Sequence, residues 1–173
     1  DGIGIGLDFL PSSIRFNSKE WSFEPSELFY KNNDLDVKTF ALVSGNERIS
    51  IEGKASQEKA DTLNLNLEHF DISIVDHILK QDFGTKGLAT GTVQLTSPLK
   101  DKGILIDMIC DSTSFASTPL GILNIGSRWN DADKDFEIFV RNDLEGKNNI
   151  NAYGTLKPDG GLLDITADLD RPD

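Results

Sequence analysis

The sequence predicts an all-β fold, and three observations support this prediction. Apolar and polar residues alternate in short runs, as in LNLNL at 63–67, so that each run has one apolar face. The runs recur at roughly 8–12 residue spacing with turn residues between them, such as Asn32-Asn33-Asp34. A helical period replaces the alternation in one stretch, near residues 71–83.

The alternating runs predict about ten or eleven antiparallel strands in an up-and-down order, most of them joined by tight loops. In the first half the runs lie at 14–16, 21–23, 28–30, 35–43, 49–55 and 63–67. In the second half they lie at 89–95, 104–110, 123–125, 136–140, 150–152 and 163–169. Almost every run has one apolar and one polar face, which is typical of antiparallel sheets.

A short amphipathic helix is predicted between the two halves. Four apolar residues fall at the i, i+1, i+4, i+5 spacing of one helical stripe: Ile74, Val75, Ile78 and Leu79. Asp71 or Ser73 can cap this helix, and Gly84 and Gly87 release the chain into the next strand.

Strands with one apolar face must cover that face, and periodicity alone leaves three ways to do so. They can form a β-sandwich, a closed barrel, or one sheet curled around its apolar side. We interpret residues 1–173 as a single β domain, divisible into two repeat units at 12–70 and 87–170 with the helix at 71–83 between them.

Composition and charge exclude several classes of function. The net charge of −12 argues against nucleic acid as a partner, because phosphate binding needs a basic face. No apolar run reaches the ~18 residues of a membrane helix, and no signal peptide is visible. The ends, DGIGIG and DLDRPD, do not resemble natural termini, so we expect a fragment of a longer protein.

The sequence contains no constellation typical of an enzyme or of a cofactor site. His69 and His77 do not have zinc-ligand spacing, and Cys110 has no evident histidine partner. DADKDFE, residues 131–137, imitates a calcium loop but lacks its glycine and its final glutamate. GIGIG lacks the βαβ unit of a dinucleotide site. We therefore expect no catalytic residue, metal or cofactor.

Several segments, in this order, resemble the TamB family (translocation and assembly module) of AsmA-like cell-envelope proteins. The segments are LVSGNERISIEGKAS, DTLNLNLEHFDISIVDHIL, GLATGTVQLTSPLKDKGILIDMICDS, LGILNIGSRW and INAYGTLKPDGGLLDITADLD. They span about residues 35–170. Each piece is a degenerate β pattern, but the ordered set with its intervening helix is unusual.

The resemblance implies a long Gram-negative protein that is anchored in the inner membrane and crosses the periplasm. Its repeats are half-rolled, β-taco-like sheets with a continuous hydrophobic groove. Two activities in outer-membrane biogenesis are implied: phospholipid transfer between membranes, and assembly or secretion of outer-membrane barrel and autotransporter proteins with a BamA-like partner. The expected ligands are phospholipid acyl chains or unfolded outer-membrane protein strands, and exposed groove ends could make the fragment dimerise.

The alternating faces supply the residues expected to line such a groove. They are Ile49, Ile51, Leu63, Leu65, Leu67, Val93, Leu95, Ile104, Ile106, Ile125, Phe136, Ile138, Val140, Leu163 and Ile165. The stripe of the helix would cap the groove or mark a boundary between units. Without the resemblance, a closed core is the simpler interpretation of the same residues. A third hypothesis is a carbohydrate-binding β-sandwich that uses Trp21, Phe23 and Tyr30.

Overall fold

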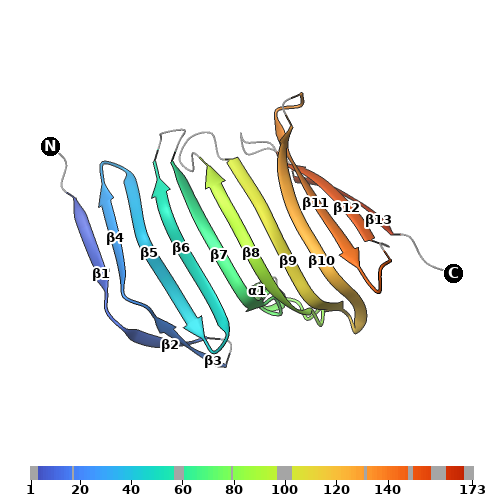
Figure 1. The fold of residues 1–173 in the computed structure, drawn as a ribbon, viewed down its shortest axis with the longest axis horizontal. Helices are drawn as coiled ribbons and strands as arrows, with labels where there is room; N and C mark the ends of the chain where they lie inside the picture. The colour runs from blue at the N-terminus through green and yellow to red at the C-terminus, as the bar shows by residue number, and fades with distance from the viewer. Residues whose placement is uncertain are drawn as a thin grey trace. The chain divides into compact units, whose positions relative to one another are not determined.

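The computed structural model describes residues 4–16, 18–56, 61–78, 80–96, 103–130, 132–147, 150–156 and 163–169. These contain thirteen strands and one helical turn (Figure 1). The strands are β1 (Ile5–Phe9), β2 (Ser12–Phe16), β3 (Lys19–Phe23), β4 (Ser26–Lys31), β5 (Asp34–Ser44), β6 (Glu47–Ala55), β7 (Thr62–Asp71), β8 (Lys86–Thr96), β9 (Gly103–Phe115), β10 (Thr118–Asn130), β11 (Asp135–Asp143), β12 (Ile150–Leu156) and β13 (Leu163–Leu169). The helix is α1 (Ile74–Ile78).

All of these strands belong to one long antiparallel sheet, so the prediction of an all-β fold is confirmed. The strand order is β1-β4-β5-β6-β7-β8-β9-β10-β11-β12-β13, with β2 paired to β3 and β3 paired to β5. β1 and β13 stand at opposite ends of this order, and the sheet is not closed. A β-sandwich would instead divide the strands between two packed sheets.

The up-and-down order holds from β4 to β13 but is wrong at the N-terminal end. There β1, which is not among the predicted runs, pairs with β4. β3 and β4 share the long strand β5, because β3 pairs with its end near Leu42 and β4 pairs with its start. Pro25 lies between β3 and β4 and has no N–H to donate, while the N–H of Glu24 donates to the carbonyl of Ala41 at 3.0 Å.

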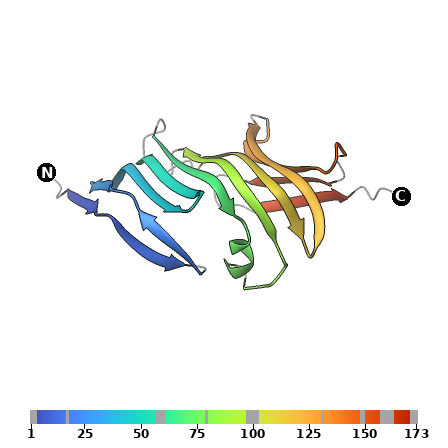
Figure 2. The same cartoon turned by 60° about the horizontal axis from the view of Figure 1, so that its bottom comes forward.

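The helix predicted over 71–83 is a single turn, which Figure 2 brings forward between β7 and β8. Asp71 accepts a hydrogen bond from the N–H of Ser73 at 3.0 Å just before the turn. Lys80 then adopts a left-handed conformation, with φ of 52°, and the N–H of Gln81 donates to the carbonyl of Asp76 at 3.0 Å. This is the Schellman arrangement, which ends the helix early with a lysine where glycine is usual.

The chain divides into two compact units. Unit 1 contains Asp1–Glu68 and Thr92–Ile104, and unit 2 contains His69–Gly91 and Leu105–Asp173. The buried apolar residues of unit 1 are Trp21, Val37, Ala41 and Ala55, and those of unit 2 are Ala89, Cys110 and Phe136. Among the described residues, then, neither unit buries a row of large aliphatic side chains.

Candidate functional site

The strand register gathers aliphatic side chains on one face of unit 1. Directly opposed residues of an antiparallel pair point to the same side of the sheet. Across β5, β6 and β7 one row contains Phe40, Ile51 and Leu65. The adjacent rows contain Leu42, Ile49 and Leu67, and Val37, Gly53 and Leu63. We call this surface the apolar face of unit 1.

A side-chain hydrogen bond places part of β8 on the same apolar face. The amide of Gln94 donates to the side-chain oxygen of Asn64 at 2.8 Å, so the two amides share one side of the sheet. Asn64 alternates with the leucines of β7 and therefore lies on the opposite, polar face. Val93 and Leu95, which flank Gln94, consequently lie on the apolar side.

Unit 2 has an apolar face of its own, built by β9 to β12. Met108, Ile125, Val140 and Ala152 form one row across these strands. Ile138 lies opposite Ser127, and Phe136 lies opposite Trp129, on the same side. By alternation Ile106 joins this face, while Ile104, its neighbour along β9, belongs to unit 1. The backbones of Leu163 and Ile165 pair with Leu156 and Gly154.

Most of the predicted lining residues remain partly accessible. Of those whose side chains are described, Phe136 is buried, Leu95 is exposed and the others are half-buried. The chain exposes 11421 Å² to solvent, whereas a compact protein of 19.0 kDa exposes roughly 8,400 Å². A single layer of sheet explains the excess, because the described strands form one sheet and supply no second layer over the aliphatic rows.

The predicted helical stripe is only partly described. Ile74 begins α1 and is half-buried, and Val75 and Ile78 lie within the turn. Leu79 lies outside the described residues. The connection after α1 makes an apolar contact through Phe83, whose ring is stacked on that of Phe115 with 5.5 Å between centroids.

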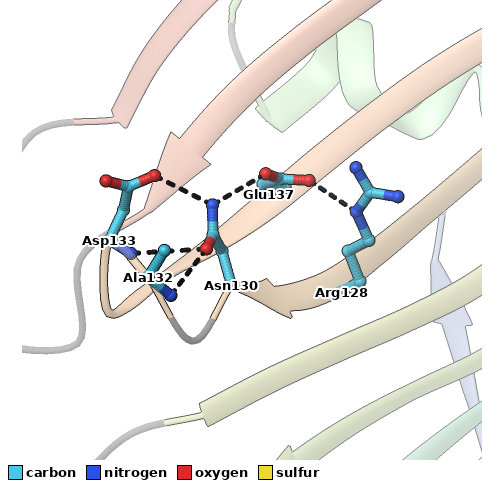
Figure 3. A network of polar contacts seen from close by, with 5 residues as sticks. All are labelled: Arg128, Asn130, Ala132, Asp133 and Glu137. Carbon is cyan, nitrogen blue, oxygen red and sulfur yellow. Dashed lines mark hydrogen bonds and ion pairs between the residues drawn. The ribbon is translucent and has the colours of Figure 1, made fainter.

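The opposite face carries polar networks in both units. In unit 1 Arg48 pairs with Glu24 and Glu68. In unit 2 the side-chain amide of Asn130 donates to Asp133 and Glu137, and Arg128 pairs with Glu137 (Figure 3). Two carboxylates of the DADKDFE stretch, Asp133 and Glu137, thus hold the turn between β10 and β11. Asp135 is buried and its Oδ1 has no hydrogen-bond partner among the described residues, which do not include Asp131. In the described ranges no cluster of His, Cys, Asp or Glu can hold a metal ion.

The titratable residues singled out in the sequence have ordinary structural surroundings. His69 is exposed, and its positive φ of 48° interrupts the regular alternation of side chains along β7. The ring Nδ1 of His77 lies 3.4 Å from the carbonyl oxygen of Ser73. Cys110 is 2% exposed, and its burial raises the pKa of the thiol. A neutral buried thiol acts as a small apolar side chain rather than as a nucleophile.

A pocket beside α1 has no counterpart in the sequence patterns. It has a volume of about 920 Å³ and lies between the α1 connection and β8, with Asp76, His77 and Lys86 in its wall. Its carboxylates hold the loop together: Asp76 accepts from the N–H of Thr85 at 2.9 Å, and Asp82 accepts from the N–H of Gly84 at 3.1 Å. The hydrogen bond with Thr85 also lowers the pKa of Asp76.

No protein-family model matches the sequence, and neither a curated protein nor a solved structure is found to be similar to it. Within the described part of the chain, none of the helical structure has the length and apolar character of a membrane span.

Proposed function

We propose that this chain is a non-catalytic module that binds phospholipid acyl chains on the apolar face of its sheet. The observation that carries the proposal is the alignment of half-buried aliphatic side chains, such as Ile51 and Leu65, in rows across neighbouring strands. Each methylene removed from water contributes about 0.8 kcal/mol, so a chain lying along such a row gains affinity steadily with its length.

The TamB-like motifs suggest the setting of this activity. In the proposal the sheet is half rolled, so that its apolar side lines a groove, and α1 caps that groove. The module belongs to a periplasmic protein anchored in the inner membrane, and it takes part in phospholipid transfer during outer-membrane biogenesis. A groove that holds the acyl chains while the head groups remain in water would carry a lipid across the aqueous periplasm.

The N-terminal edge of the sheet favours a second candidate function, a scaffold for assembling outer-membrane barrel proteins. β1 pairs with β4 on one side, and its other side is an edge among the described strands. Ile5 and Leu7 of this strand are 53% and 54% exposed. An unfolded client strand could add to such an edge through backbone hydrogen bonds, and a BamA-like protein would receive it.

Native mass spectrometry of the purified chain, with lipid analysis after organic extraction, tests the lipid proposal. The informative variant is Leu65→Asp, which puts a charge on the apolar face. Asn66→Asp is the matched control, because it adds the same charge one residue further on the polar face. Circular dichroism reports whether each variant is folded.

We expect phospholipid on the wild type and on Asn66→Asp, and none on folded Leu65→Asp. A wild-type chain that neither carries lipid nor takes it up from added phospholipid would overturn the proposal. In that case, pull-down of an unfolded barrel-protein strand, compared with a variant that has proline in β1, would test the scaffold function.

A further inference from the structure

Three phenylalanine side chains from three different strands meet on the apolar face of unit 1. Phe40 of β5 packs edge-on against Phe9 of β1, with 5.4 Å between ring centroids. It packs in the same way against Phe23 of β3, at 5.7 Å. Phe9 and Phe23 are stacked at 6.3 Å with 14° between their planes. We call these three rings the phenylalanine cluster.

A small buried residue lets rings from non-adjacent strands touch. β4 lies between β1 and β5 in the sheet, and its residue opposite Phe9 is Ser26. Ser26 is 5% exposed, and its hydroxyl donates to the carbonyl of Glu24 at 2.7 Å. Because a serine side chain is short, Phe9 and Phe40 meet above it.

The phenylalanine cluster stands at the end of two of the three rows, whereas the row of Val37 continues to Leu28 of β4 and Leu7 of β1. Phe40 is in register with Ile51 and Leu65, and Phe23 is in register with Leu42. A ligand that lies across the strands from β7 toward β5 travels about 10 Å along such a row, at about 4.8 Å per strand. It then meets Phe40, whose ring is backed by the other two.

The direction across the strands is also the one in which the apolar face continues. Along the strands, the apolar face is bounded by the polar turn of Gly45 and Asn46, where β5 ends and β6 begins. Lys19 and Glu47 form an ion pair beside this turn. An acyl chain that lies parallel to the strands therefore meets polar groups at this end of the apolar face.

From this arrangement we infer that the phenylalanine cluster is the stop that limits how far an acyl chain extends along the apolar face of unit 1. The inference rests on the proposed lipid-binding function and deepens it, because it assigns the residues that determine chain length. Each ring is held by contacts with the other two, so the cluster cannot turn aside without losing aromatic contacts. The aliphatic rows bind the acyl chain, and the phenylalanine cluster blocks its further extension.

Binding of saturated fatty acids that increase by two carbons tests this inference. In the wild type the dissociation constant should fall about fourfold per added methylene while the chain still covers aliphatic surface. It should become constant once the chain end reaches the cluster. In Phe9→Ala the affinity should continue to rise for at least two further carbons, because the backing of Phe40 is removed.

Two further variants keep the test decisive. Phe40→Leu retains an apolar side chain in the row and should shift the plateau even if Phe9→Ala proves unstable. Phe29→Ala is the matched control, because Phe29 lies opposite Asp36 on the other face, and its plateau should equal that of the wild type. Binding with no plateau, or a plateau that neither cluster variant moves, overturns the inference alone. Failure of every chain to bind the wild type overturns the proposed function as well.

Discussion

The guanidinium of Arg48 donates a hydrogen bond to the carboxylate of Glu24, with 2.6 Å between Nη1 and Oε1. Arg48 lies in β6, and Glu24 lies in the connection where β3 ends and β4 begins. The backbone of Glu24 is held as well, through its hydrogen bond to Ala41. The pair therefore fixes the point at which two short strands share one long neighbour.

The Arg48 hydrogen bond predicts a pH-dependent contribution to stability. It lowers the pKa of Glu24 below the ordinary value of 4.5. A carboxylate with a lowered pKa stabilises the fold fully above 4.5, and this contribution is lost as the pH falls through the lowered value. Because the side chain of Glu24 is 43% exposed, we expect less than about 1 kcal/mol.

Urea denaturation at about pH 6 and about pH 3 measures this contribution for the wild type and for Glu24→Gln. The variant should lose free energy of unfolding at the higher pH and differ little at the lower one. Glu27→Gln, an exposed position in β4, controls for the loss of one negative charge. Equal losses at both pH values would contradict the prediction.

Gly91 of β8 should tolerate no side chain. Its φ is 150°, and an added Cβ would lie 2.6 Å from the Cα of Met108 and closer still to the carbonyl oxygen of Asp107. Backbone atoms cannot move aside cheaply, so we expect Gly91→Ala to lower the free energy of unfolding by roughly 2–4 kcal/mol. Urea denaturation measures the loss.

Gly45→Ala separates this clash from backbone strain alone. Gly45 also has a positive φ, 60°, but an added Cβ would meet nothing within 4 Å. We expect a cost of about 1–2 kcal/mol, the penalty of a left-handed conformation. If Gly91→Ala lowered the free energy of unfolding no more than Gly45→Ala, the result would contradict the close approach of β8 and β9.

Asn142 of β11 should be important for stability although it is polar. It is 1% exposed, its amide donates to the carbonyl of Leu120 at 3.0 Å, and its oxygen accepts from the N–H of Ile150 at 2.8 Å. Asn142→Ala leaves both backbone groups without these partners, which should cost roughly 2–4 kcal/mol. Thermal denaturation tests this, with Asn124→Ala at an exposed position of β10 expected to change little.

The thiol of Cys110 should be unreactive in the folded protein. Burial keeps it from reagents, and the same burial raises its pKa and so reduces the thiolate. Intact-mass measurement should show slow maleimide labelling of the native chain and rapid labelling in denaturant. The variant Cys110→Ala/Thr92→Cys, with its thiol at an exposed position, should label rapidly when folded. Rapid native labelling of the wild type would contradict the burial.

The strands themselves follow from local pattern. The alternation of leucines at 63, 65 and 67 with Asn64 and Asn66 specifies both a strand and its two faces, because side chains point to alternate sides at every residue. The single helical turn is likewise local, since Asp71 holds the backbone just before it and Lys80 ends it. β1 has the same alternation, with Ile5, Leu7 and Phe9 separated by Gly6 and Asp8, although it is not among the predicted strands.

The candidate site could not be predicted from local sequence, because it depends on which strands pair with one another. The same alternation suits a sandwich, a barrel or an open sheet, and pairing between distant strands depends on the free energy of the whole fold. The phenylalanine cluster shows this most clearly: Phe9, Phe23 and Phe40 are separated along the chain and meet only because β1 pairs with β4 and β3 with β5. The sequence by itself determined which residues are apolar and, through their alternation, which face of each strand carries them. The tertiary structure decided that these faces join in one unclosed sheet, because strand pairing is a non-local choice among nearly equivalent partners.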